Sequence, residues 1–144
     1  MKQIKSTMQF QGYSVLEANY VSKEKQATSA SESRIELSPS FSQRVSKISD
    51  HRYSLELGII IGNQKQSDEL PFYINVRIQG FFVLSDEEKA YELMRVNATA
   101  IMYPYLRSTV TSLTALANIN PIILPTINLV QMFQDSQEKK ETEQ

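Results

Sequence analysis

Hydrophobic and polar residues alternate along two stretches of the chain, and this pattern predicts two β-strands. The clearest is 70–84, where one side carries Leu70, Phe72, Ile74, Val76, Ile78, Phe82 and Leu84, and the other carries Tyr73, Asn75, Arg77 and Gln79. The stretch 53–61 repeats the pattern, with Tyr53, Leu55, Leu57, Ile59 and Ile61 on one side. A period of two is typical of a strand with one buried face and one wet face.

Two further stretches alternate less regularly and predict two more strands. The stretch 34–45 contains Pro39, which is typical of an edge strand or a bulge. The stretch 8–21 is rich in Phe, Tyr and Val, and its irregular alternation predicts a bulge near Gly12. The polar, serine-rich segment 23–33 between these two strands is expected to be a loop.

The second part of the chain predicts helices. Ser85 followed by Glu88 has the spacing of a capping box, and apolar residues from Met94 to Leu116 follow one helical stripe. Pro104 lies inside this stripe and predicts a kink or a join between two helices. Prolines at 121 and 125 predict an extended loop over 118–126.

A second capping box, Asn128 with Gln131, predicts a short helix that ends at Phe133. Residues 134–144 contain no large apolar side chain and are expected to be a disordered tail. The prediction is therefore one α+β domain over 1–133. It has a four-stranded antiparallel sheet, a long kinked helix, a proline-rich crossover loop and a short C-terminal helix.

Between Val96 and Phe133 the sequence carries a single charged residue, Arg107. A helix with one solvated face usually displays Lys, Glu and Arg there, so both faces of this helix are expected to be covered. The cover is either the rest of the same domain or another subunit, and the small size of the chain favours another subunit. The residues assigned to this interface are Ile101, Tyr105, Arg107, Thr111 and Thr114.

Arg107 itself needs a partner, because a lone buried arginine is costly. Two partners are open: an acid of a neighbouring copy, such as Glu92, or backbone carbonyl groups. The apolar run Ile122-Ile123-Leu124 in the predicted loop is equally unusual, since loops are normally polar. It either plugs the core or forms an exposed binding patch, and both hold if alternate side chains point in and out.

Composition and charge exclude several classes of function. The chain has 144 residues, a net charge of −1, no cysteine and one histidine, His51. These values argue against nucleic-acid binding, thiolate chemistry and a histidine-rich metal site. Asp50-His51 is expected to be a solvated turn, and no glycine-rich phosphate loop is present, so neither catalysis nor a cofactor is predicted.

The ends and the hydropathy of the chain predict its location. No apolar run follows the first lysines and no window of 18 apolar residues exists, so neither a signal peptide nor a membrane span is expected. The expected compartment is the cytoplasm.

Two segments of the second half resemble the SecB family of export chaperones. They are 103–107, which reads Tyr-Pro-Tyr-Leu-Arg, and 119–129, which reads Ile-Asn-Pro-Ile-Ile-Leu-Pro-Thr-Ile-Asn-Leu. Gly80-Phe81-Phe82 with the acidic 86–88 is also similar to the family. The resemblance implies a homotetramer, built as a dimer of dimers, that holds unfolded precursor proteins without ATP and passes them to the SecA motor.

The resemblance also implies which residues line the client groove. By position they are Phe81, Ile122, Ile123, Leu124, Ile127, Leu129, Met132 and Phe133. Two departures from the family open an alternative. The chain is nearly neutral where export members are acidic, which bears on SecA, and the loop carries Asn120 and Thr126 where the family often has aromatic residues or proline. The alternative is a SecB-like oligomer with one dedicated partner, such as a chaperone that guards an antitoxin.

Overall fold

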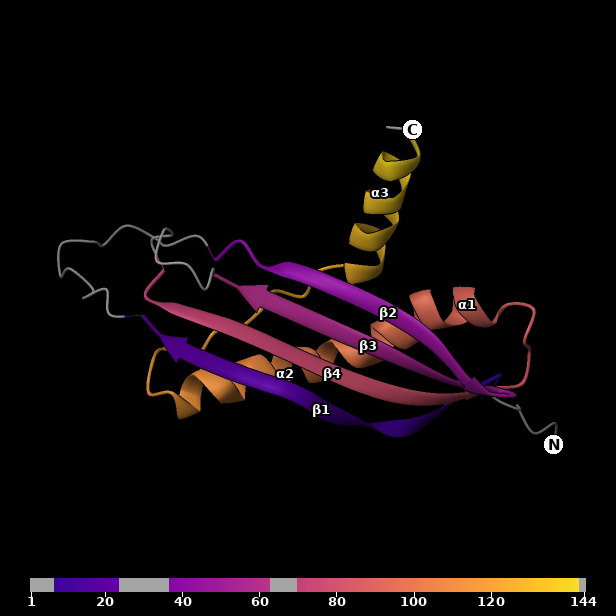
Figure 1. Cartoon of the computed structure of the whole chain (residues 1–144), viewed down its shortest axis with the longest axis horizontal. Helices are drawn as coiled ribbons and strands as arrows, with labels where there is room; N and C mark the ends of the chain where they lie inside the picture. The colour runs from indigo at the N-terminus through magenta and orange to yellow at the C-terminus, as the bar shows by residue number, and fades with distance from the viewer. Residues whose placement is uncertain (1–6, 24–36, 63–69, 143–144) are drawn as a thin grey trace.

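The computed structural model of this chain describes residues 7–23, 37–62 and 70–142, with side chains as far as Asp135. Four strands form one antiparallel sheet in the order β1-β4-β3-β2, and helices follow (Figure 1). The bounds are β1 Met8–Ser22, β2 Ser40–Ser49, β3 Arg52–Ile61, β4 Phe72–Leu84, α1 Ala90–Leu93, α2 Thr99–Leu116 and α3 Leu129–Thr142. The predicted α+β architecture and strand number are confirmed. Most of the predicted loop 23–33 lies outside the described residues.

The sheet has a covered face and an open face. Side chains of β3 and β4 at alternate positions are buried, and α2 lies behind the sheet in Figure 1. Met94, Met102, Leu106 and Val110 of the helical segment complete this core. Gly80 permits the close approach, because a Cβ atom there would collide with the end of Met102. We call the face that packs on α2 the helix face and the opposite one the outer face.

Each edge strand carries a β-bulge. The pairing of β1 with β4 shifts between Phe10 and Tyr13, where Gly12 adopts φ 103°. The predicted bulge near Gly12 is confirmed, and glycine suits it because L side chains rarely adopt this conformation. A matching shift occurs in β2 between Lys47 and Ser49. β2 begins directly after Pro39, so the predicted strand starts later than expected.

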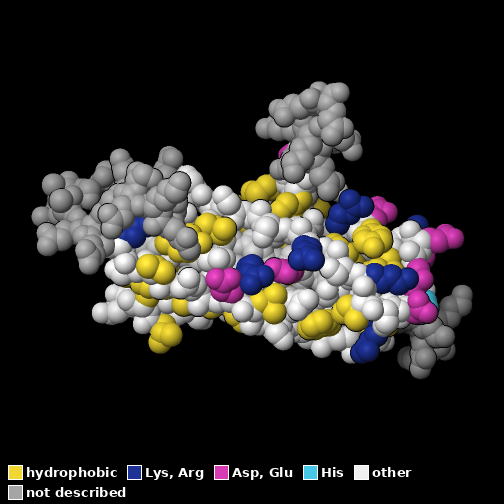
Figure 2. Space-filling model, viewed as in Figure 1, with side chains coloured by type: hydrophobic (Ala, Val, Ile, Leu, Met, Phe, Trp, Pro, Cys, Tyr) yellow, Lys and Arg dark blue, Asp and Glu magenta, His cyan; other side chains and the backbone are white. Residues whose placement is uncertain are grey.

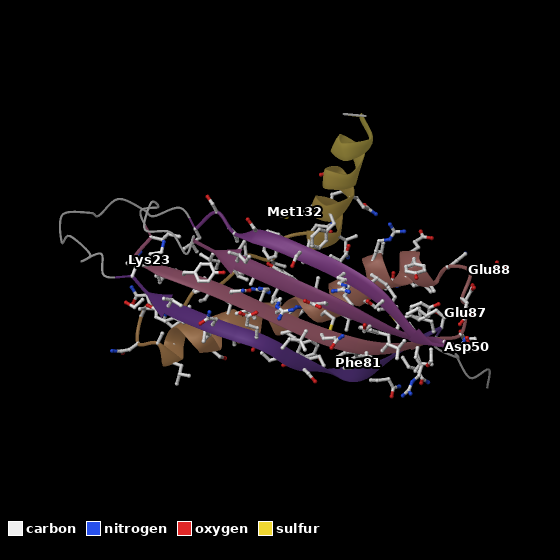
Figure 3. All side chains as sticks on the ribbon, in the orientation of Figure 1. Lys23, Asp50, Phe81, Glu87, Glu88 and Met132 are labelled. Carbon is white, nitrogen blue, oxygen red and sulfur yellow. The ribbon has the colours of Figure 1, made fainter. Side chains whose placement is uncertain are left out.

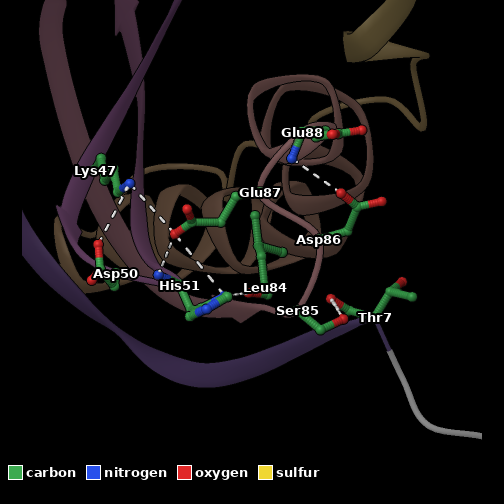
Figure 4. Close-up of polar contacts among 9 residues, drawn as sticks. All are labelled: Thr7, Lys47, Asp50, His51, Leu84, Ser85, Asp86, Glu87 and Glu88. Atoms are coloured by element: carbon green, nitrogen blue, oxygen red, sulfur yellow. Dashed lines mark hydrogen bonds and ion pairs between the residues drawn. The ribbon is translucent and has the colours of Figure 1, made fainter.

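The predicted capping box at Ser85 is wrong. The first helix begins at Ala90, and Lys89 at its N-cap makes no side-chain hydrogen bond. Of the acidic residues before it, Glu87 contacts the neighbouring turn instead, and Asp86 accepts the backbone N–H of Glu88 at 3.0 Å (Figure 4). Glu87 Oε1 accepts the backbone N–H of His51 at 2.8 Å and lies 3.4 Å from Lys47 Nζ. The His51 N–H is the main cause that lowers the pKa of Glu87.

The helical segment is continuous from Ala90 to Leu116 and passes through Pro104. Its irregularity lies upstream of the proline, in a π-helical turn at Met94–Ala98. Gln43 of β2 stabilises this turn, because its Nε2 donates to the Arg95 carbonyl oxygen at 2.9 Å and to Thr99 Oγ1 at 2.6 Å. A carbonyl oxygen of the π-turn is thereby satisfied by a side chain of the sheet.

The C-terminal helix is longer than predicted. Asn128 Oδ1 accepts the N–H of Gln131 at 3.1 Å, so the predicted N-cap at Asn128 is confirmed. The helix then continues to Thr142, so the predicted end at Phe133 is wrong, and the disordered tail over 134–144 stays a prediction. In Figure 1, α3 projects away from the sheet. Residues 143–144 lie outside the described residues.

Candidate functional site

A crossover segment, 117–128, joins α2 to α3 and is held against α2 by side chains. α2 ends with Asn118 at φ 62°, where Asn118 N–H and Ile119 N–H bond back to Ala115 and Thr114 carbonyls at 3.1 and 3.3 Å. This is a Schellman-type end, which turns the chain back along the helix. The segment is then fixed by four side chains at helical spacing, Tyr103, Arg107, Thr111 and Thr114, which we call the anchor stripe.

Two threonines of the anchor stripe hold both backbone groups of Ile122. Thr114 Oγ1 accepts the Ile122 N–H at 2.8 Å and donates within the helix to the Val110 carbonyl at 3.0 Å. The hydroxyl of Thr111 donates to the Ile122 carbonyl at 2.8 Å. An extended loop residue next to a helix has no strand partner, so these hydroxyl groups take the place of one.

The other two anchors hold carbonyl groups further along the segment. Arg107 Nε donates to the Leu124 carbonyl at 3.0 Å, and Tyr103 Oη donates to the Pro125 carbonyl at 2.8 Å. The Arg107 guanidinium also lies 6.0 Å from the Tyr103 ring centroid. Burial raises the pKa of Tyr103, so its hydroxyl remains a donor at neutral pH. Of the two partners expected for Arg107, the backbone carbonyl is the one observed.

This anchoring fixes which side chains of the loop are accessible. Ile122 and Leu124 are 8% and 1% exposed, whereas Ile123 between them is 75% exposed. The expectation that alternate side chains point in and out is confirmed. Ile122 and Leu124 therefore fill the core. Ile123 lies on the surface, and the backbone is fixed on both sides of it.

Two hollows lie beside α2, one at Ile123 of the loop and one next to α3. The loop hollow, about 300 Å³, is lined by Pro104, Arg107, Ser108, Thr111, Ser112 and Ile123. The helix groove, about 580 Å³, lies between the start of α2 and α3 and is lined by Val96, Asn97, Ala100, Ile101, Asn128, Val130, Gln131 and Gln134. Apart from Arg107, whose Nε is already bonded, these side chains are uncharged. Such surfaces suit apolar and backbone groups of a polypeptide.

The structure brings together most, but not all, of the predicted groove residues. Ile122, Leu124 and Leu129 are buried as supports, Ile127 and Phe133 are half-buried, and Ile123 and Met132 are exposed. Phe81 is separate. Its neighbours Gly80 and Phe82 face α2, so Phe81 points to the outer face, and Figure 3 shows it well apart from Met132.

The predicted interface residues divide into three groups. Thr114 is fully buried within the protomer, so its assignment to a subunit interface is wrong. Arg107 and Thr111 serve the crossover segment, which covers part of the uncharged helix face. Ile101 and Tyr105 are 37% and 36% exposed and stay as predicted interface residues. Tyr105 contacts Tyr13 of the edge strand β1, with ring centroids 4.6 Å apart.

His51, the single histidine, is engaged in structure. His51 Nδ1 donates to the Leu84 carbonyl at 2.8 Å beside the Lys47–Glu87 pair. In the part of the chain that the structure describes, no three His, Asp or Glu side chains gather as a metal site. No helix of the described ranges is long and apolar enough to cross a membrane.

Sequence reasoning missed the role of Tyr103 and the amide groups of the helix groove. The spacing of the anchor stripe, with intervals of four, four and three residues, was visible in the sequence. It predicts one helical face but not what that face contacts.

The match to a family model decides the family. Residues 8–140 match the model described as preprotein translocase subunit SecB. This chain belongs to the SecB family. The match includes all four strands, the anchor stripe and nearly all of α3, which supports the resemblance seen in the sequence.

Relatives agree with this membership. An uncharacterized protein of Methanocaldococcus jannaschii is 34% identical over 100 residues, which is 68% of this chain and 64% of the relative. The protein-export protein SecB of Saccharophagus degradans is 28% identical over 93 residues, 62% of this chain and 55% of the relative. The chain thus spans less than two thirds of both. The protein-export protein SecB of Neisseria meningitidis is 28% identical over 106 residues, which is 69% of this chain and 72% of the relative.

A solved structure shares the fold. It is the SecB-like chaperone of Mycobacterium tuberculosis in complex with a peptide from the HigA1 antitoxin, with a TM-score of 0.67 and 14% identity. The match covers 84% of this chain and 91% of that chain. The SecB-like fold of this chain is therefore confirmed.

Proposed function

We propose that this chain is an ATP-independent chaperone that holds unfolded polypeptide segments on the surface formed by the crossover segment, α2 and α3. The observation that carries the proposal is Ile123, which is 75% exposed on a loop whose backbone is fixed at Ile122 and Leu124. A loop whose backbone is already fixed loses little backbone conformational entropy when it binds a client. The role is one of binding, with no chemical step, and its expected place is the cytoplasm.

The client surface in this proposal is smaller than the residue set predicted from sequence. Ile123 and Met132 contact the client directly, Ile127 and Phe133 lie at its margin, and the buried Ile122, Leu124 and Leu129 support it. The helix groove adds amide groups of Asn97, Asn128, Gln131 and Gln134. Apolar side chains beside uncharged amides suit clients of many sequences, because backbone groups are common to all of them.

Assembly as a homotetramer is part of the proposal. The exposed face of α2 carries Ile101 and Tyr105, and Tyr105 continues it to Tyr13 and the open edge of β1. An uncharged helix face next to an unpaired strand edge is a surface that proteins normally cover. A second copy is the occupant that a closed symmetric assembly supplies.

The resemblance also implies delivery to SecA, but the charges on the outer face argue against it. On the outer face, Arg77 bonds Glu17 Oε2 at 3.1 Å and Glu56 Oε1 at 2.6 Å, and Arg44 lies opposite Glu56. Figure 2 shows this row of alternating charges across the sheet. Because each acid in the row faces a base, the row offers no acidic surface to a basic partner.

A second candidate function is a SecB-like protein with one dedicated client. The fold shared with the antitoxin-bound chaperone of Mycobacterium tuberculosis favours this candidate, and the same surface would serve it. One experiment separates the two. The purified chain is titrated against several chemically unfolded proteins, and turbidity is recorded while light scattering gives its mass. Suppressed aggregation of all clients supports the general chaperone, and no suppression by an intact oligomer supports the dedicated binder. A monomer that suppresses no aggregation would contradict both candidate functions.

A further inference from the structure

A second pocket lies on the outer face, on the side of the sheet opposite α2. We call it the outer pocket. It has a volume of about 370 Å³ and is lined by Gln11, Ile48, Arg52, Tyr53, Phe81, Phe82 and Val83. All four strands contribute, near the end of the sheet that holds the β2–β3 turn. The client surface proposed above lies on the other face, so this pocket needs its own explanation.

Two of the three register shifts in the edge strands meet at the outer pocket, and the third, between Val15 and Glu17, lies further along β1. The bulge of β1 spans Gln11 and Gly12, and the bulge of β2 contains Ile48. Gln11 and Ile48 both line the pocket, on opposite edges of the sheet. Bulges redirect side chains and are common beside binding sites. Two bulges that place their residues in one pocket indicate a site shaped by the fold.

Arg52 provides the charge of the outer pocket. Its side chain takes part in no hydrogen bond or ion pair with any residue that the structure describes. Two other basic residues of the sheet differ, since Lys47 lies 3.4 Å from Glu87 and Arg77 bonds two carboxylates. An unpaired guanidinium has five donors in a planar arrangement that matches a carboxylate.

Apolar side chains surround this guanidinium. Ile48 is 54% exposed, and Phe81 and Val83 are half-buried on the outer face. Figure 2 shows hydrophobic and basic side chains toward this end of the sheet, together with acidic side chains at its margin. Exposed isoleucine and phenylalanine beside arginine have the composition of a protein–protein contact centre.

We propose that the outer pocket is a docking site for a partner segment that carries a carboxylate next to a large apolar side chain. The apolar side chain packs on Ile48, Phe81 and Val83, and the carboxylate pairs with Arg52. This inference goes beyond the proposed function, because it concerns a partner on the opposite face from the client.

Two other occupants fit the charge less well. Residues 1–6 of the same chain contain two lysines and no acid, so they would place like charge beside Arg52. A second copy docked by a two-fold axis through the pocket would place Arg52 next to its own equivalent. A partner with an acidic segment avoids both repulsions.

The test uses a fluorescein-labelled peptide in which aspartate alternates with leucine and phenylalanine, and a control peptide with lysine in place of aspartate. Anisotropy gives the affinity, and methyl NMR of the intact protein follows Ile48. The acidic peptide is expected to bind and to shift the Ile48 methyl signal. Arg52→Glu should weaken its binding about tenfold. The matched variant Arg44→Glu, also an exposed arginine of the outer face, should change it less than about twofold.

The outcomes decide between occupants. Equal binding of the acidic and basic peptides, or equal loss in both arginine variants, would overturn the proposal. Loss of acidic-peptide binding in Ile123→Asp, with an unchanged Ile48 signal, would assign the peptide to the client surface and overturn it as well. A lower oligomer mass in Arg52→Glu would instead identify a second copy as the occupant. Binding that appears only after removal of residues 1–6 would identify that segment.

Discussion

The hydroxyl oxygen of Thr114 lies 2.8 Å from the backbone nitrogen of Ile122 and accepts its hydrogen bond in a fully buried position. Through this bond a residue of α2 fixes Ile122 of the crossover segment. The side chain that follows, Ile123, is thereby turned to the surface. The proposed client surface thus depends on polar contacts beneath it.

Replacing Thr114 with valine should destabilise the protein. The substitution preserves shape but leaves the buried N–H of Ile122 without an acceptor, which costs about 1–3 kcal/mol. Thr109→Val is the matched control, because the Thr109 hydroxyl bonds only within α2, at 2.8 Å from the Tyr105 carbonyl, and should cost less than about 0.5 kcal/mol. Urea unfolding at one fixed protein concentration measures both, and equal losses would contradict the anchoring role.

Arg107→Met should loosen the loop and leave the assembly intact. The variant keeps an apolar stem but loses the donor to the Leu124 carbonyl, which is 3.0 Å away. Loss of this bond, at about 1.4 kcal/mol, should speed amide exchange in the crossover segment about tenfold. Light scattering should give the wild-type mass. A lower oligomer mass with an unchanged rate of amide exchange would show that Arg107 acts at the subunit interface instead.

The contribution of Glu87 should depend on pH. The His51 N–H is the main cause that lowers the pKa of Glu87 in the folded state, and the Lys47 side chain also lowers it. A carboxylate with a lowered pKa stabilises the fold above its unfolded value, about 4.3, and this stability is lost as pH falls through the folded value. The melting temperature of wild type should therefore exceed that of Glu87→Gln at pH 7, and the difference should shrink as pH falls below about 4.3.

Glu88→Gln serves as the control for this prediction. The backbone N–H of Glu88, and not its carboxylate, makes the local bond, at 3.0 Å to Asp86 Oδ1. Its melting temperature should follow wild type at every pH. A difference between wild type and Glu87→Gln that stays constant with pH would exclude titration of Glu87 as the cause.

Ile101→Lys should lower the oligomer mass. Ile101 is 37% exposed on the uncharged face of α2, and a lysine there would bury a charge if a second copy covers the face. Ile60→Lys is the control, since Ile60 is 41% exposed on the outer face, away from α2. Light scattering should show a smaller species for the first variant and the wild-type mass for the second. Two unchanged masses would contradict assembly through α2.

Local patterns in the sequence predicted the sheet well. Alternation located β3 and β4, Gly12 located a bulge, and Asn128 located the start of α3. Each of these signals lies within a few residues of the structure that it specifies. The crossover loop was also predictable from the sequence, because two prolines exclude a helix there.

The errors came from contacts between distant segments. Ser85 looked like an N-cap, but Glu87 bonds the turn at His51 and the helix begins later. Thr114 looked like an interface residue because it is an uncharged position of a covered helix. Its cover is Ile122, eight residues further along the chain, and side-chain spacing alone does not tell a loop from a second subunit.

The most direct test of the central claim compares Ile123→Asp with Ile60→Asp in the suppression of aggregation. Both variants place the same charge at an exposed isoleucine, one on the crossover loop and one on the outer face. Ile123→Asp should need about ten times more protein than wild type for the same suppression, whereas Ile60→Asp should match wild type. Wild-type suppression by Ile123→Asp in an intact oligomer would contradict the account.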